Sequence, residues 1–519
     1  MRYFIPAWYN NGNWWEDKTA PFYSRRLVKE FDDAISLMNM HVKSKEDFKL
    51  LILNYYPDLR LFLHTHDLYE TNYWSLFDDI QGFTHKTPQP IDYSELNWPD
   101  GTEFIYSPYL IRAVTSESTY SNIYFNPYGY MIWIEDFEQQ QRTKRYIFDD
   151  RGFLSTILFF DENGTAMTQE FMTSDGDTIL TLHLINGSVT VSDKYKQRFN
   201  QQHYESMETL LTEKVESYEA MHMKQSDNII IAADTRHNQM LSQIFKSYAL
   251  CFSIFKNRNL PLTNEQLKTI EQSSYWLVDM LDNEETLKNY KNEHHLDTHI
   301  MRITPFDTEV LPNISSQLYE TYIGLWVDGL DEARLKQAFS QIVSYMQQED
   351  QLRLVLLTEK EKSKLPTWLS EQVQAINDQH NSLGVDPDGA ELLLAEEEDY
   401  VEIIQVKYVP FESDLIEAIS TLRIIVDLNN EPDLFLQICS ISAGLPQINM
   451  RTTDYVNHEV NGLVLNSVED INQGLDYFLS HLKHWNYSYA YSIKLVDTFA
   501  SKNIIQRLNQ WFEGEINET

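Results

Sequence analysis

The stretch that decides the fold begins at Glu431 and reads Glu-Pro-Asp-Leu-Phe-Leu-Gln-Ile-Cys as far as Cys439, then runs on to Gly444-Leu445-Pro446. A polar start is followed by an apolar run of helical length, and the glycine and proline mark its end. A buried-type strand, Ile424 to Leu428, comes just before it. This strand-loop-helix order is typical of a parallel α/β sheet, in which ligands bind at the carboxyl ends of the strands.

The same stretch resembles the donor-site signature of two-lobed (GT-B) retaining glycosyltransferases, in which Glu-x7-Glu is followed by an Ala-x-Ala-x-Gly-x-Pro turn. The resemblance implies that the first acid touches the donor sugar and that the second binds the ribose hydroxyls. Glu431 keeps the first acid, and Gly444 keeps the glycine of the turn. Cys439 stands where the second acid belongs, and a thiol behaves more like a small hydrophobe than a ribose ligand.

Further positions of this family's donor site are also altered. Pro432 replaces the glycine after the first acid, and proline offers no N–H to a diphosphate. Aligning the strand Tyr322 to Trp326 with the family places Leu325 and Leu330 where an arginine and a lysine clamp the diphosphate, which then has no Coulomb partner. Gly12 is the glycine left in the loop after the first strand. We interpret these positions as a vestigial donor cleft, without catalytic residue, cofactor or metal: Gly12, Leu325, Leu330, Glu431, Pro432, Cys439 and Gly444.

Composition and charge narrow the function classes. The chain has 519 residues, 42% hydrophobic and 13% aromatic, which suits roughly three globular domains. A net charge of -37 argues against nucleic acid as a partner. With two cysteines, no signal peptide and no apolar run of about 20 residues, we expect a cytosolic protein. Arg25, Arg26 and Lys29 are a small basic candidate for peripheral contact with the inner face of the cell membrane, although a solvated helix face is the simpler interpretation.

Between residues 102 and 191 the β/α pattern gives way to short β-branched and aromatic runs. The turns between these runs contain glycines at regular spacing, namely Gly152, Gly164 and Gly176. Glycine adopts positive φ in tight turns without steric cost, so this pattern predicts an antiparallel meander. The β/α pattern then returns, and apolar spacing predicts a helix from Leu241 to Phe255.

We therefore predict an α/β fold with two Rossmann-like lobes in a GT-B glycosyltransferase-like arrangement and a β-rich antiparallel domain inserted in the first lobe. Part of this arrangement, a C-terminal helix that crosses back to the first lobe, is implied by the glycosyltransferase resemblance. The expected segments are 1–66 and 211–315 for the first lobe, 67–210 for the inserted domain, 316–485 for the second lobe and 486–519 for the crossing helix.

Three strings connect the whole chain to one family: Tyr3 to Tyr9, Thr71 to Gln81 and Arg302 to Asp307. They resemble recurring segments of the accessory Sec system proteins (the Asp family) of Gram-positive cocci. The resemblance implies a cytosolic, non-catalytic GT-B-like protein that assembles with two other accessory Sec proteins. Together with a dedicated SecA-type motor, that complex helps to export glycosylated serine-rich repeat adhesins. The inserted domain resembles that of the glycosyltransferases that modify these adhesins, where it serves polypeptide binding and assembly.

Two other functions stay open. An active retaining glycosyltransferase acting on a Ser/Thr-rich protein would keep Glu431 at the donor sugar. A glycan-binding module would use the cleft or aromatic side chains of the inserted domain, such as Tyr128, Tyr130 and Trp133.

Overall fold

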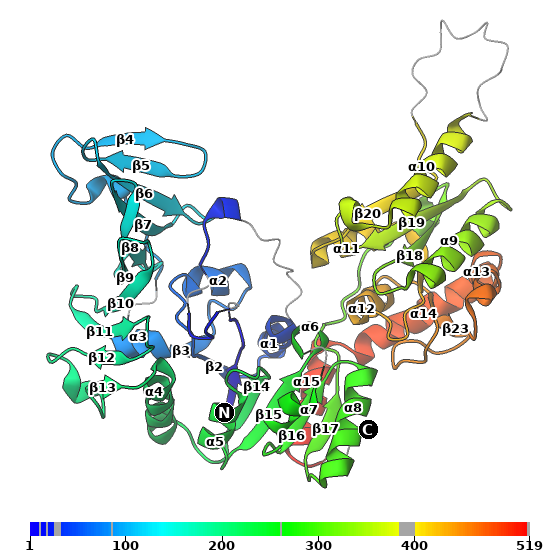
Figure 1. Ribbon diagram of the computed structural model, residues 1–519. Helices are drawn as coiled ribbons and strands as arrows, with labels where there is room; N and C mark the ends of the chain where they lie inside the picture. Colours follow the sequence, from blue (N-terminus) through cyan, green and yellow to red (C-terminus); the bar gives the residue numbers. More distant parts are fainter. Residues whose placement is uncertain are drawn as a thin grey trace, which may run out of the picture.

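A computed structural model of the chain describes residues 1–9, 12–16, 19–24, 33–84, 87–259, 262–382 and 400–515. The first lobe lies at the base of a V, from which a β-rich domain rises on one side and the second lobe on the other (Figure 1). The basic group Arg25, Arg26 and Lys29 lies outside the described residues. The limits given above for the five segments stay predictions.

The first lobe is built on a seven-stranded parallel sheet in the order β17-β16-β15-β14-β1-β2-β3. Its strands are short apolar runs, as expected where helices cover both faces of a sheet. The strands are β1 (Arg2–Ile5), β2 (Phe48–Ile52), β3 (Asn72–Ser75), β14 (Asn228–Ala232), β15 (Ala249–Ile254), β16 (Tyr275–Val278) and β17 (His299–Arg302). The helices are α1 (Asp33–Lys43), α2 (Leu59–Thr65), α3 (Leu76–Gln81), α4 (Met207–His222), α5 (Asn238–Ile244), α6 (Lys256–Asn259), α7 (Asn264–Lys268) and α8 (Leu281–His294).

The helix predicted from Leu241 to Phe255 is wrong beyond Ile244. α5 ends at Ile244, a turn follows over residues 245–248, and Ala249–Ile254 form β15, an interior strand of the first sheet. Both faces of β15 are covered, and Cys251 and Phe252 are fully buried on opposite faces. A strand buried on both faces lacks the two-residue alternation, so periodicity does not distinguish it from a buried helix.

The β-rich domain is a ten-stranded antiparallel sheet whose strands follow one another in chain order from β4 to β13, which confirms the predicted meander. Gly152, Gly164 and Gly176 have φ of 85°, 78° and 81° in its turns. The strands are β4 (Glu103–Tyr106), β5 (Ile111–Val114), β6 (Thr119–Phe125), β7 (Met131–Glu138), β8 (Gln141–Phe148), β9 (Leu154–Phe160), β10 (Ala166–Met172), β11 (Thr178–His183), β12 (Val189–Val191) and β13 (His203–Tyr204).

A buried ion network fastens this sheet to the first lobe. Arg60 of α2 donates to Asp150 (2.7 Å), to Asp149 (2.9 Å) and to Asp78 of α3 (3.1 Å). Arg151 donates to Asp149 at 2.6 Å and to Asp78 at 2.7 Å. Both arginines are at most 2% exposed. The glycine-containing turn between β8 and β9 therefore supplies three of the five charged side chains at this junction, namely Asp149, Asp150 and Arg151.

The second lobe contains a six-stranded parallel sheet in the order β20-β19-β18-β21-β22-β23. The strands are β18 (Thr321–Trp326), β19 (Leu352–Thr358), β20 (Ile404–Tyr408), β21 (Leu422–Asp427), β22 (Gln447–Asn449) and β23 (Gly462–Val464). The helices are α9 (Glu332–Met346), α10 (Thr367–Ser382), α11 (Glu412–Ile419), α12 (Leu434–Ser442) and α13 (Ile471–Leu479).

The last two helices connect the lobes. α14 (Leu482–Thr498) lies against α12 of the second lobe, and α15 (Ser501–Phe512) lies against α1 of the first lobe. Arg2 donates to Asn509 at 2.7 Å, and the Trp511 ring meets Tyr275 edge-on at 4.8 Å. One apolar core contains side chains of both lobes and of both helices, so the lobes share buried surface at the base of the V.

Candidate functional site

Glu431 lies in the loop between β21 and α12, and its carboxylate binds the first lobe. One oxygen accepts from the Leu281 amide and the other from the Asp282 amide, each at 3.1 Å, at the start of α8. Arg451 donates to the second oxygen at 2.8 Å. A carboxylate at a helix N-terminus satisfies amides that have no partner within the helix and interacts favourably with the helix dipole. Burial raises the pKa of Glu431, while these donors oppose the rise.

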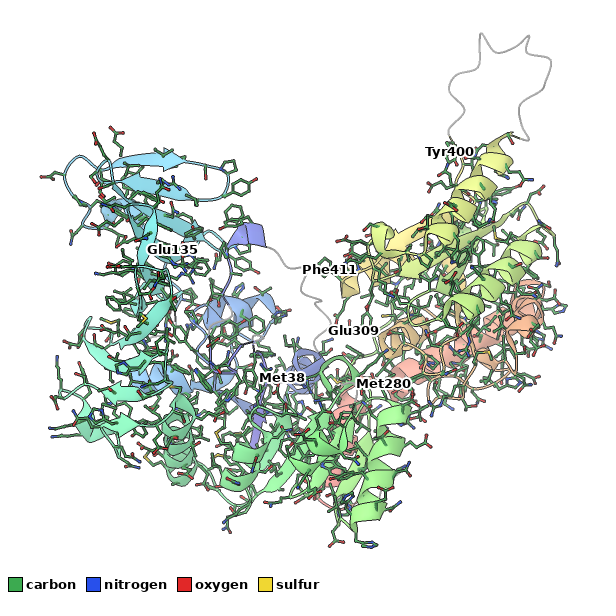
Figure 2. The ribbon with its side chains drawn as sticks, in the orientation of Figure 1. Met38, Glu135, Met280, Glu309, Tyr400 and Phe411 are labelled. Atoms are coloured by element: carbon green, nitrogen blue, oxygen red, sulfur yellow. The ribbon has the colours of Figure 1, made fainter. Side chains whose placement is uncertain are left out.

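Further ion pairs cross the same junction between the lobes. Arg451 also pairs with Asp282. Lys256 of α6 lies 3.6 Å from Asp433, and Arg302 at the end of β17 lies 2.9 Å from Asp454. Figure 2 labels Met280, the residue before α8, at the base of the V where the lobes meet. Charged contacts and the shared apolar core thus hold the lobes together at the position of the expected donor sugar.

Leu325 and Leu330, at the positions of the family's diphosphate clamp, belong to the apolar core of the second lobe. Leu325 is fully buried in β18, and Leu330 is half-buried against the same core. Arg334 of α9 donates to the Leu428 carbonyl (3.2 Å) and to Asn430 (2.9 Å). Its guanidinium therefore binds neutral acceptors at the carboxyl end of β21.

Two aspartates hold the segment around Pro432, at the end of the loop before α12. Pro432 is buried, and the Asp433 amide donates to Asp427 at 2.7 Å. Asp433 in turn caps α12 by accepting from the Leu436 amide at 3.0 Å. Burial raises the pKa of Asp427 to about 6. The amides that would face a diphosphate in the family bind carboxylates here.

Cys439 lies in the middle of α12 and is 4% exposed. Burial raises the pKa of its thiol well above the usual range, so the side chain is neutral. It lines a cavity of about 380 Å³ between the lobes, whose charged lining consists of Lys43, Asp67, Asp307, Glu309 and Glu412. Lys43 is paired with two of these acids. A nucleoside diphosphate would meet four carboxylates and one already paired cation.

The neighbours of Gly444 and Gly12 are other residues of this chain. Gly444 follows α12 with φ of 71°, and a Cβ there would lie 2.3 Å from the Tyr489 ring of α14. Gly12 is exposed in the first lobe, where its carbonyl accepts from Arg236 at 3.5 Å. The structure thus brings Leu325, Leu330, Glu431, Pro432 and Cys439 to the neighbouring strands β18 and β21 and the segments after them, whereas Gly12 belongs to the other lobe.

Sequence reasoning missed Asp328 and Arg451. Asp328 follows β18 and accepts from the Thr358 hydroxyl (3.1 Å) and the Glu359 amide (2.6 Å). Its place directly after a buried strand was a usable signal, because such positions meet at the ligand-binding edge of a parallel sheet. Arg451 gave no such signal, since its partners Glu431 and Asp282 lie 20 and 169 residues away and no local pattern joins them.

The three aromatic side chains considered for glycan binding differ in how exposed they are. Tyr128 is 58% exposed, and its hydroxyl accepts from Thr65 at 3.0 Å. Tyr130 is half-buried. Trp133 is only 9% exposed and lies under the Arg145 guanidinium, 4.8 Å from the ring centre. Trp133 is therefore the least accessible of the three side chains, because the Arg145 guanidinium lies over its ring.

In the part of the chain that the structure describes, no group of three or more His, Cys, Asp or Glu side chains is arranged to hold a metal ion. Over the same residues, no helix combines the length and apolar character needed to cross a bilayer.

Comparison with known proteins agrees with the fold and the strings quoted above. The family model of the accessory Sec system protein Asp, first member, matches residues 1–515. The protein of that name from Staphylococcus aureus (strain NCTC 8325 / PS 47) is 46% identical over 520 residues, covering 100% of both chains.

Solved structures show the same architecture. The crystal structure of accessory secretory protein 1, 2 and 3 in Streptococcus pneumoniae contains a chain with 29% identity and a TM-score of 0.75, covering 99% of both chains. The pneumococcal O-GlcNAc transferase GtfA, solved with UDP and GlcNAc, has a TM-score of 0.65 at 12% identity, covering 99% of both chains, a likeness of fold alone. The predicted GT-B-like arrangement is confirmed, and the chain belongs to the family of the accessory Sec system protein Asp, first member.

Proposed function

We propose that this protein is a non-catalytic scaffold of a cytoplasmic accessory Sec complex, in which it binds partner proteins and the glycosylated serine-rich repeat adhesin that the complex exports. One observation carries the proposal. Both carboxylate oxygens of Glu431, the residue that would touch a donor sugar, bind amides of α8, and one of them also binds Arg451. A group held in this way supports the junction between the lobes and does not face a substrate.

The electrostatics of the same region favour this role over sugar transfer. Catalysis of transfer from a nucleotide sugar needs positive charge at the leaving diphosphate. Leu325 and Leu330 supply no positive charge. The acids Asp328, Asp427 and Asp433 lie at or just after the carboxyl ends of β18 and β21. The cations beside these acids are already paired, Lys360 with Asp328 and Lys256 with Asp433, so a diphosphate placed there would compete with carboxylates for them.

The shape of the molecule suits assembly. Its two arms and shared base offer separate surfaces to other proteins (Figure 1). The S. pneumoniae structure, whose chain this one resembles, is of accessory secretory proteins 1, 2 and 3. We expect the partners to be two other accessory Sec proteins. The SecA-type motor, the adhesin and the inner face of the cell membrane are further candidate contacts of the assembled complex.

Co-purification tests the proposal. The full chain is co-expressed with the two neighbouring accessory Sec proteins, and the mass of the product is measured by light scattering after gel filtration. We expect one complex containing all three chains, stable at about 1 μM, and the same complex from the Glu431→Gln variant, because Glu431 acts within the chain. A chain that elutes alone from this mixture contradicts the scaffold role.

A further inference from the structure

A cavity in the β-rich domain has no part in the site described above. It has a volume of about 460 Å³ and opens beside the segment of residues 96–99, which crosses β6, β7 and β8. These strands lie in the arm opposite the second lobe (Figure 1). Cavities of this size commonly hold small ligands or one or two rings of a larger one.

One wall of the cavity is a fixed aromatic surface. The Trp98 indole N–H donates to the Tyr93 carbonyl at 2.7 Å, and the ring meets Phe104 edge-on with centres 5.7 Å apart. Trp98 also packs, half-buried, on the apolar core beneath the segment. Tyr146 and Phe148 of β8 line the cavity as well. The wall is therefore preorganised, and a ligand would not have to order it.

The polar side of the cavity consists of hydroxyls and carboxylates. Asp136 accepts from the Ser121 hydroxyl at 2.6 Å, and Thr143 and Glu138 lie on the same lining. Burial, and then Asp136, raises the pKa of Tyr146 to about 12, so its phenol stays protonated as a donor. Carboxylates accept hydrogen bonds from neighbouring hydroxyls of a ligand, and the Ser and Thr hydroxyls both donate and accept.

No lysine or arginine is found among the described residues that line the cavity. The nearby cations are engaged: Arg142 of β8 pairs with Glu135 of β7 at 2.7 Å, and the Lys144 ammonium lies over the Phe159 ring of β9. Arg112 of β5 lies over the Tyr120 ring and donates to Asn122. With two carboxylates and no cation, the cavity disfavours an anionic ligand. The lining suits a ligand ring that has C–H groups on its face and hydroxyls around its edge. The face would pack on the aromatic wall, and the hydroxyls would bond to the carboxylates and hydroxyls opposite.

We infer that this cavity binds a neutral sugar ring, which stacks on Trp98 and donates its hydroxyls to Asp136. The inference rests on the proposed function for the source of the sugar, the glycans of the exported adhesin. The glycan contact then lies on the face of the sheet opposite to Trp133. Recognition of a glycan here would let the scaffold select chains that have already been glycosylated.

Saturation-transfer NMR on the full chain tests the inference with methyl β-glucoside and methyl N-acetyl-β-glucosaminide as probes, and glucuronate as a charged comparison. We expect saturable binding of at least one neutral glycoside with Kd on the order of 1 mM, as suits a ligand of this size. Glucuronate should bind at least about tenfold more weakly, because its carboxylate meets Asp136 and Glu138.

Three variants assign the site. Trp98→Ala should weaken glycoside binding at least about tenfold. Asp136→Asn, which keeps the side-chain shape, should weaken it severalfold and reduce the discrimination against glucuronate. Tyr487→Ala, at an aromatic side chain of α14 that is 62% exposed, is the matched control and should bind as the wild type does.

The inference is overturned if neither glycoside binds the wild type, or if Trp98→Ala binds the glycosides as tightly as the wild type does. Lysine amide serves as a cationic comparison, and the inference is also overturned if it binds in the cavity and the glycosides do not. The outcome is separate from that of the assembly test. A chain that forms the three-protein complex but binds no glycoside refutes the sugar site alone, and a chain that binds glycosides but never assembles refutes the scaffold role alone.

Discussion

Replacing Arg60 with methionine lowers the melting temperature of the protein by roughly 10 °C, since removing one partner of a buried ion network costs about 3–5 kcal/mol. Arg60 is 1% exposed and donates to Asp78, Asp149 and Asp150. Without it, Arg151 still pairs with Asp78 and Asp149, whereas Asp150 loses the guanidinium that pairs with it. Burial raises the pKa of Asp150 even though Arg60 opposes the rise, so loss of Arg60 should raise it further.

Calorimetry measures the shift, and hydrogen exchange locates it. We expect the loss of amide protection to concentrate in β8, β9 and α2, the elements that the network joins. Arg353→Met is the control, because that guanidinium donates to the carbonyls of Asp350 and Leu352 near the surface. Equal shifts for both variants would mean that the network does not fasten the β-rich domain to the first lobe.

Gly444→Ala is the second large effect that we expect, with a loss of about 2–5 kcal/mol. Its φ of 71° costs a non-glycine residue about 1–2 kcal/mol. The added Cβ would also lie 2.3 Å from the Tyr489 ring, and overpacking of this kind costs about 1–3 kcal/mol. The glycine that the donor signature shares with active enzymes thus serves the packing of α12 on α14.

Gly514→Ala separates the two contributions. Gly514 has φ of 72°, but a Cβ there meets nothing within 4 Å, so this variant pays the backbone term only. Thermal unfolding should place Gly444→Ala well below Gly514→Ala, and Tyr489→Ala combined with Gly444→Ala should recover part of the difference. If the two glycine variants melt together, the contact with Tyr489 has no energetic importance.

The architecture was predictable because its signals are local. Strands of the second lobe and the glycine-containing turns of the meander each follow from residues close together in the chain, whereas the crossing of the last helix was implied only by the glycosyltransferase resemblance. The error at β15 has a physical cause: Ala249–Ile254 is buried on both faces and follows α5 after a short turn, so apolar spacing continues from helix into strand. The local sequence pattern does not distinguish a strand buried on both faces from a buried helix.

The candidate site was predictable only in part. Pro432, Cys439 and the two leucines indicated from the sequence that a diphosphate has no partner. What takes its place was not visible, because Glu431 binds amides 150 and 149 residues earlier in the chain. The pairing of Arg60 with Asp150 is likewise 90 residues apart. Contacts of this kind depend on how the lobes and the inserted domain meet, and no local pattern encodes that.

We propose that the region of the donor cleft serves in this chain as a structural junction between the lobes. Isothermal titration of UDP-glucose and of UDP-N-acetylglucosamine into the full chain, with Glu431→Gln titrated in parallel, is the decisive experiment. We expect no saturable heat for either nucleotide sugar up to about 1 mM, the upper end of ordinary enzyme KM values, in the wild type and in the variant alike. Saturable binding to the wild type that Glu431→Gln abolishes would refute the structural role of the cleft.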